Sequence, residues 1–129
     1  MPAAAKLITG VVDDQLTMRS LVQACLNQIG VFDVHLYQEA ADALEKLRVQ
    51  PVHVLISDFN MPGMDGLELL RVIRADARFA KMAFILLTGR ADKELVQRAV
   101  QLGANNYLVK PFTAAQLKQK IEQVVGALT

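Results

Sequence analysis

Five short apolar runs, separated by segments of helical periodicity, constrain the fold of this chain more than any other feature of its sequence. The runs occupy residues 7–12, 31–37, 52–56, 82–87 and 107–109. Their hydrophobicity is continuous rather than alternating, which is typical of strands that are buried on both faces of a parallel sheet. We therefore expect five parallel strands, with helices covering both faces of a single sheet.

Residues suited to helix boundaries stand between these runs. Gly30 and Gly103 follow apolar stripes of helical spacing and are suited to C-caps, whereas Asp92 is suited to an N-cap. Residues 113–116 match a capping box, in which a hydroxyl and an amide three residues apart satisfy each other's backbone donors. Strand and helix thus alternate five times, which predicts a doubly wound α/β fold of the (βα)5 kind.

Length and composition indicate one compact domain spanning residues 1–129. Of the 129 residues, 53% are hydrophobic and 21% charged, a composition too apolar for a disordered protein. Residues 1–6 carry neither a basic segment nor an apolar run of signal-peptide length, so we expect no secretion signal there and interpret them as a flexible N-terminal tail. The first strand is not followed by a glycine-rich nucleotide fingerprint, which argues against a dinucleotide-binding domain.

Charge and cysteine content exclude several classes of function. The net charge is +1, from 14 basic and 13 acidic residues, so neither nucleic acid nor a membrane surface is an expected partner. No stretch approaches the ~18 consecutive apolar residues that would indicate insertion into a membrane. The single cysteine, Cys25, lies on the apolar side of a predicted helix and cannot form an internal disulfide, so we expect a cytoplasmic protein.

Polar residues follow four of the five apolar runs. Asp13 and Asp14 follow the first run and Asp58 the third, while Thr88 and Lys110 follow the fourth and fifth. The carboxyl ends of parallel strands meet at one edge of the sheet, where open α/β folds bind ligands. Three carboxylates, a hydroxyl and a lysine gathered at that edge predict a magnesium-dependent phosphoryl site.

Each of these residues has a simpler explanation when it is taken alone. An Asp pair before a helix is commonly a cap, and Asp58 fits an ordinary turn. Thr88 and Lys110 precede a glycine and a proline, which are common where strands end. Their coincidence at the correct strand ends favours a site in which a metal relieves the carboxylate repulsion and leaves one carboxylate as a nucleophile toward phosphorus.

Several short motifs at these positions resemble those of response-regulator receiver domains, in particular the single-domain, CheY-like chemotaxis members. The matching segments are residues 11–14, 17–19, 57–58, 60–62, 64–70, 88 and 110–115. The resemblance covers almost the whole chain. It implies a flavodoxin-like sheet of five parallel strands in the order 2-1-3-4-5, and a response regulator of two-component signal transduction.

The resemblance also implies a role for each acidic residue. Asp58 is similar to the aspartate that is phosphorylated in the family, and Asp13 and Asp14 are similar to the pair that holds Mg²⁺, with Mn²⁺ as an alternative ion. Asn60 would add its backbone carbonyl to this metal site. A histidine kinase would donate the phosphoryl group to Asp58, and the domain would assist its own phosphorylation and dephosphorylation without being an enzyme.

The remaining site residues resemble the switch of the family. Thr88 and Lys110 are similar to the switch hydroxyl and the phosphate-binding lysine, and Tyr107 to the aromatic residue that moves inward when the hydroxyl bonds the phosphoryl group. The positions that match the surface for the flagellar switch are Ala91, Lys93, Tyr107 and Lys120. The expected partners of a monomeric chain are thus a histidine kinase, the flagellar switch or another downstream protein, and a phosphatase.

Three positions depart from the family pattern. Gly10 stands inside the first strand, where a bulky apolar residue is usual, and is expected to loosen the packing beneath the acidic pair at a cost of roughly 0.5–1 kcal/mol. Phe59 takes the place of a tryptophan. Arg90 stands where the family often has an acidic or small residue, and we expect it to alter the lifetime of the acyl phosphate.

Other functions remain open from the sequence. Phosphatases of the haloacid-dehalogenase kind also use an aspartate, a hydroxyl, a lysine and Mg²⁺, but they need a second acid where this chain has Asn60. A phosphorylation-independent interaction module would tolerate the loss of site residues, and none is lost here. Within signalling, motor control, a phosphorelay and a phosphate sink are all compatible with the motifs.

Overall fold

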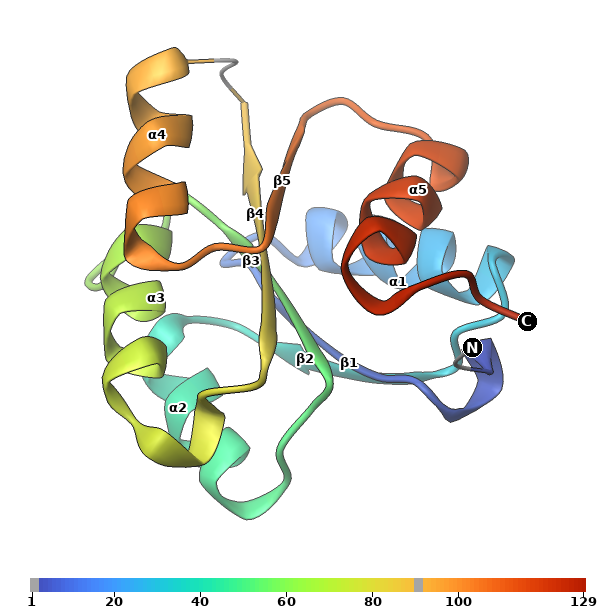
Figure 1. Ribbon diagram of the computed structural model, residues 1–129, viewed down its shortest axis with the longest axis horizontal. Coiled ribbons are helices and arrows are strands. Elements are labelled where there is room, and N and C mark those ends of the chain that lie inside the picture. Colours follow the sequence, from blue (N-terminus) through green and yellow to red (C-terminus); the bar gives the residue numbers. More distant parts are fainter. Residues whose placement is uncertain (1–2, 90–91) are drawn as a thin grey trace.

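The computed structural model describes residues 3–89 and 92–129, which form one five-stranded parallel sheet (Figure 1). The strands are β1 (Ile8–Val12), β2 (Asp33–Tyr37), β3 (Val54–Asp58), β4 (Ala83–Thr88) and β5 (Asn106–Val109). Their order is β2-β1-β3-β4-β5, and every neighbouring pair is parallel. The expected doubly wound fold and strand order are confirmed.

Five helices cover the sheet in two layers (Figure 1). Helices α1 (Leu16–Gln28) and α5 (Ala114–Val125) lie on one face, and α2 (Ala40–Val49), α3 (Gly66–Ala75) and α4 (Lys93–Leu102) lie on the other. Two short 3₁₀ helices, η1 (Ala4–Lys6) and η2 (Ala77–Phe79), complete the fold. Within the described ranges, no helix has the length and apolarity needed to cross a membrane.

Adjacent residues of the central strands point into opposite layers. Leu55 and Phe84 pack on the side of α2, α3 and α4, whereas Ile56 and Ile85 pack on the side of α1 and α5. All four side chains are fully buried. Burial on both faces explains why the apolar runs are continuous, as a two-sided parallel sheet requires.

The helix boundaries follow local sequence signals. The Asp92 side chain accepts backbone N–H groups in the first turn of α4, and Gly103 ends that helix in the left-handed conformation, with φ of 104°. Thr113 opens the expected capping box of α5. A second capping box joins Asp65 and Glu68 at the start of α3, so the turn after β3 is fixed by its own side chains.

The described part of the N-terminal segment, for which the sequence predicts a flexible tail over residues 1–6, contacts the C-terminal end of the chain. Residues 4–6 form η1, Ala4 is buried, and its backbone N–H donates to the carbonyl of Thr129 at 3.2 Å. The small Ala4 side chain packs beside Leu7 in the layer under α1 and α5. The described part of the segment is therefore attached to the C-terminal end of the chain.

Gly10 does not loosen the strand in which it lies. A Cβ at this position would lie 2.8 Å from the Tyr37 ring and 3.0 Å from the Leu55 side chain. The Tyr37 ring thus fills the space that a bulky residue would take, and only 2% of Tyr37 is exposed. Burial, aided by the Asp42 carboxylate, raises the pKa of Tyr37 to about 12. The missing side chain is compensated by a large one on β2.

Candidate functional site

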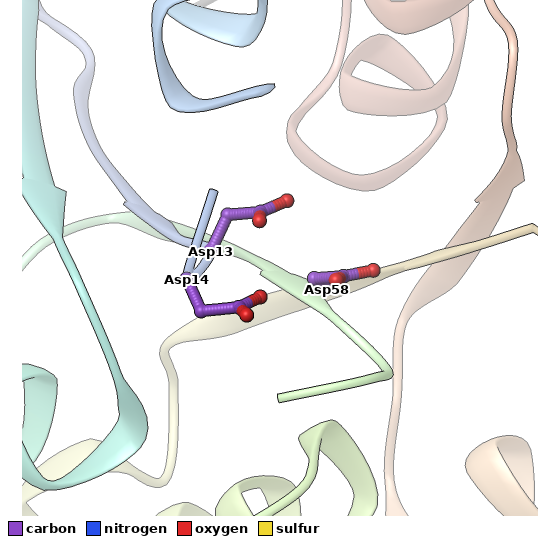
Figure 2. Close-up of side chains that lie close together, drawn as sticks. All are labelled: Asp13, Asp14 and Asp58. Carbon is purple, nitrogen blue, oxygen red and sulfur yellow. The ribbon is translucent and has the colours of Figure 1, made fainter. Parts of the chain in front are cut away.

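Three carboxylates meet at the carboxyl end of the sheet (Figure 2). Asp58 is the last residue of β3, and Asp13 and Asp14 follow the neighbouring strand β1. One oxygen from each side chain lies within 4.8 Å of the others. In Figure 2 the carboxylates of Asp13 and Asp14 extend toward Asp58. The sheet therefore brings together the acidic residues that the sequence analysis placed at neighbouring strand ends.

The backbone of Asp13 is held on both sides. Its N–H donates to the Tyr37 carbonyl at 3.2 Å, and its carbonyl accepts a hydrogen bond from Arg19 Nη1 at 2.6 Å. One carboxylate oxygen, Oδ1, accepts the Gln15 N–H at 2.9 Å. The other, Oδ2, is buried and forms no hydrogen bond within the described residues. These contacts fix the side chain with one oxygen left for a further ligand.

The electrostatics of the site favour a cation. Burial raises the pKa of Asp13, the carboxylates of Asp58 and Asp14 raise it further, and the Gln15 N–H and Lys110 ammonium act in the opposite direction. Ionised Asp13 is therefore destabilised by its surroundings. Hard divalent cations prefer oxygen ligands, and a buried carboxylate oxygen that accepts no hydrogen bond from the described residues, beside two more carboxylates, suits such an ion. The residues present fit a metal site.

Lys110 places a positive charge next to the carboxylate cluster. Its ammonium donates to Asp58 Oδ1 at 2.8 Å and lies 3.7 Å from Asp13 Oδ2. Only 19% of the Lys110 side chain is exposed, so solvent screens this ion pair weakly. The Lys110–Pro111 peptide is cis, and the Lys110 N–H donates to the Thr88 carbonyl at 2.8 Å. Lys110 thus contacts the carboxylate cluster directly.

Thr88 ends β4, the neighbour of β3, and is 1% exposed. Asp58 pairs with Leu87 across these two strands, so Thr88 stands one position beyond the pair. At Gly89 an added Cβ would meet no atom within 4 Å. The space next to Thr88 is open, as the sequence analysis expected of a glycine at this position.

Two residues that shape the site were not assigned to it from the sequence. Arg19 is 7% exposed although it is charged and lies on a helix, and a charged helical residue is ordinarily solvated. Gly66 opens α3 so close to β3 that a Cβ there would lie 2.5 Å from the Asp58 carbonyl oxygen. Nothing in the sequence except the motif of residues 17–19 points to the Arg19 contact. Gly66 could have been noticed, because a glycine at the start of a predicted helix can indicate a close approach of the backbone.

The expected switch and partner residues lie on the elements next to Lys110. Tyr107 is a half-buried residue of β5, and the Lys120 ammonium of α5 lies 4.8 Å from the centre of its ring. Lys93 is the exposed first residue of α4, and Asn60 is exposed just after β3. Ala91, like Arg90, lies outside the described residues. The structure therefore places Lys93, Tyr107 and Lys120 on α4, β5 and α5.

Comparisons with known proteins agree with this geometry. The family model of the response regulator receiver domain matches residues 10–122. The chain is 45% identical over 128 residues to a probable chemotaxis protein CheY of Rhizobium etli, with 99% of both chains covered. It is 43% identical over 117 residues to chemotaxis protein CheY1 of Helicobacter pylori, covering 90% of this chain and 94% of that one.

A solved structure shows the same architecture. Chemotaxis protein CheY4 of Vibrio cholerae superposes with a TM-score of 0.85 at 29% sequence identity, covering 96% of this chain and 99% of that chain. The family model spans the acidic residues, Thr88 and Lys110, and the sheet order is the one that the resemblance implied. The chain belongs to the family of response regulator receiver domains, which are signalling switches of two-component systems.

Proposed function

We propose that this receiver domain accepts a phosphoryl group on Asp58 from the phosphohistidine of a histidine kinase. The observation that carries the proposal is the ion pair of 2.8 Å between Lys110 and Asp58, next to the buried Oδ2 of Asp13, which accepts no hydrogen bond from the described residues. A nucleophilic carboxylate, a fixed cation and free ligand capacity for a metal are what phosphoryl transfer requires.

Mg²⁺, or Mn²⁺ in its place, would be held by the carboxylates of Asp13, Asp14 and Asp58 and by the backbone carbonyl of Asn60. The clustering of the three carboxylates within 4.8 Å supports this assignment. When bound, the ion supplies positive charge that offsets the negative charge of the transferring phosphoryl group. The chain's own contribution is the fixed position of these oxygens, through the hydrogen bonds that hold Asp13.

In the transfer step, an Asp58 carboxylate oxygen attacks phosphorus and forms the new P–O bond. The bond between phosphorus and the donor breaks, and the donor nitrogen leaves with the electron pair. Lys110 gives up part of its contact with Asp58 and donates to a phosphoryl oxygen instead. In this way the domain assists its own phosphorylation, and hydrolysis of the acyl phosphate returns it to the starting state.

The added charge of about −1.5 to −2 would draw Thr88 and Lys110 toward the phosphoryl oxygens and alter the surface around them. We infer that Tyr107 responds by moving inward, and that Lys93, Tyr107 and Lys120, with Ala91, form the partner surface. The relatives named as chemotaxis proteins support the flagellar switch as the downstream partner. A different downstream protein, a phosphorelay or a phosphate sink would use the same chemistry. We further propose that the protein acts as a monomer in the cytoplasm and that a phosphatase ends its signal.

The test is the incorporation of phosphate from acetyl phosphate, with and without Mg²⁺. We expect acid-labile, hydroxylamine-sensitive phosphate in the native protein with Mg²⁺ and none in Asp58→Asn, which keeps the shape of the side chain without its nucleophile. Lys110→Met should slow labelling without abolishing the Asp58 nucleophile. A native protein that takes up no phosphate from this donor or from a histidine kinase would instead be an interaction module.

A further inference from the structure

A large hollow in the described surface lies at the edge of the sheet opposite the acidic site. It has a volume of about 830 Å³ and is bordered by η1, the starts of β3 and β4, η2 and the last turn of α5. In Figure 1 the segment that follows α5 runs toward the N-terminal segment, which contributes to the border of this hollow. We propose that this hollow is a docking groove for an acidic peptide segment of a partner protein that also carries apolar side chains.

The walls of the groove are apolar. They are formed by Leu7, Val52, Met82, Ala83, Val124 and Val125. The four residues at the strand starts keep 4–6% of their surface exposed, whereas strand residues deeper in the sheet, such as Leu55, keep 0%. Apolar surface of this kind accepts an apolar side chain of a ligand, which would leave water on binding.

The rim of the groove is positively charged. Lys6, Arg78 and Lys81 are exposed around it, and no Asp or Glu of the described residues lines it. The charge of Arg78 is largely compensated, because Asp76 Oδ2 accepts a hydrogen bond from Arg78 Nη2 at 2.6 Å. Lys6 and Lys81 form no ion pair with any described residue. The chain as a whole has a net charge of only +1, so this rim is a local excess of positive charge.

His53 adds a neutral hydrogen-bond donor to the same rim. Its Nδ1 accepts the backbone N–H of Ile8 at 3.0 Å, so the proton of the neutral ring is on Nε2. The residue is exposed and lines the groove. An imidazole N–H beside the two lysines complements a carboxylate.

The combination of apolar walls and a cationic rim favours a peptide over a compact anion. A phosphate group is held by polar donors and gains nothing from apolar walls, and of the three cations that line this groove Arg78 is already bound by Asp76. An acidic peptide distributes its carboxylates along its length and places apolar side chains between them. That pattern matches exposed cations at the rim of a groove with apolar walls.

The test is a nuclear magnetic resonance titration of the full ¹⁵N-labelled chain with two synthetic peptides. One peptide carries two leucines among glutamates, and the other carries lysines in place of the glutamates. We expect the acidic peptide to shift the amides of Leu7, His53, Met82 and Ala83 while those of Asp13 and Asp58 stay in place. The basic peptide should shift none of them.

Charge variants make the test specific. Lys6→Glu with Lys81→Glu should weaken binding of the acidic peptide on the order of 10-fold, since each exposed pair contributes up to about 5-fold. Asp76→Asn releases Arg78 and should tighten binding by about 2-fold. Lys46→Glu changes the net charge by the same amount as either lysine reversal but lies on α2, away from the groove, and should leave the affinity unchanged.

Several outcomes would overturn the proposal. Equal shifts with both peptides, shifts elsewhere on the surface, or no effect of the double lysine reversal would each exclude an acidic peptide in this groove. Shifts of the groove amides on dilution without peptide would assign it to a second copy of the chain. Binding of a fatty acid but not the peptide would assign it to a small amphiphile. Phosphate incorporation at Asp58 should be the same in all these variants, so the two proposals fail separately.

Discussion

At the scale of single residues, Asp13 is held in position by residues of two other elements, β2 and α1. Tyr37 on β2 and Arg19 on α1 hold the N–H and the carbonyl of the same residue. The guanidinium is almost completely buried, and a buried charge is retained only where hydrogen bonds compensate its lost hydration. Arg19 is therefore a positioning residue for the carboxylate cluster.

We predict that Arg19→Met lowers the free energy of unfolding by about 1.5–3 kcal/mol, the usual effect of losing a hydrogen bond to a charged group. It should also weaken Mg²⁺ binding, because Asp13 loses one of its two backbone restraints. Urea denaturation and calorimetric titration with Mg²⁺ measure the two effects. Arg48→Met on the exposed face of α2 is the matched control. Equal Mg²⁺ affinity in both variants would contradict the positioning role.

Two glycines near the site provide a second test at this scale. Gly66→Ala places a Cβ 2.5 Å from the Asp58 carbonyl oxygen, whereas at Gly89 an added Cβ meets nothing within 4 Å. We predict that Gly66→Ala lowers stability by about 1–3 kcal/mol, as overpacking does, and that Gly89→Ala leaves it nearly unchanged. Thermal unfolding of both variants decides this, and equal losses would show that α3 can move away from β3.

At the scale of elements, the ion pair between Asp76, the N-cap of η2, and Arg78 within η2 makes a pH-dependent contribution to stability. Hydrogen bonds from the Arg78 side chain and backbone lower the pKa of Asp76 to about 2, from a usual value of 3.8. Because the folded-state pKa is the lower one, the pair stabilises the fold fully above pH 3.8 and this contribution is lost as the pH falls through about 2.

We therefore predict that Asp76→Asn is less stable than the native chain at neutral pH, and that the difference shrinks between pH 4 and pH 2 as the native carboxylate becomes protonated. The Arg78 side chain is 61% exposed and that of Asp76 25%, so high salt should also reduce the difference. Chemical denaturation across this pH range measures it. A difference independent of pH would assign the effect to the backbone cap of η2 alone.

The contact between β5 and α5 belongs to the same scale. Asn106 Nδ2 donates to the Lys120 carbonyl at 3.1 Å, and the Lys120 ammonium lies 4.8 Å from the Tyr107 ring centre. We predict that Lys120→Met increases the mobility of the half-buried Tyr107 ring, because a cation over an aromatic ring contributes about 0.5–1 kcal/mol even where solvent reaches the pair. Lys120→Arg should retain the native behaviour. Relaxation of the ring resonances distinguishes them, and identical spectra would contradict the prediction.

At the scale of the whole molecule, the carboxylate cluster links metal binding to stability. We predict that Asp13→Asn is more stable than the native chain without Mg²⁺, since it removes a buried charge that repels its neighbours. Mg²⁺ at 100 times its dissociation constant should stabilise the native chain by about 2.7 kcal/mol and the variant much less. Melting curves with Mg²⁺ or EDTA measure this, and equal metal stabilisation of both chains would exclude Asp13 as a ligand.

The fold and the position of the site could be predicted because both depend on local patterns. Continuous apolar runs predicted two-sided strands, and the alternation with helices then placed Asp13, Asp58, Thr88 and Lys110 at one edge. The role of Arg19 could not be predicted in the same way, because a charge on an amphipathic helix is usually solvated and its burial depends on tertiary packing. The Gly10–Tyr37 contact joins separate strands and likewise needs the three-dimensional structure.

The most direct test of the central claim is to locate the phosphoryl group on the chain. Borohydride reduces an aspartyl phosphate to homoserine, and mass spectrometry of the reduced, digested protein identifies the labelled residue. After phosphorylation with Mg²⁺, we expect homoserine at position 58 in the native protein, and none without Mg²⁺ or in Asp58→Asn. Homoserine at Asp13 or Asp14, or no reduction product at any aspartate, would contradict the assignment of Asp58 as the phosphoacceptor.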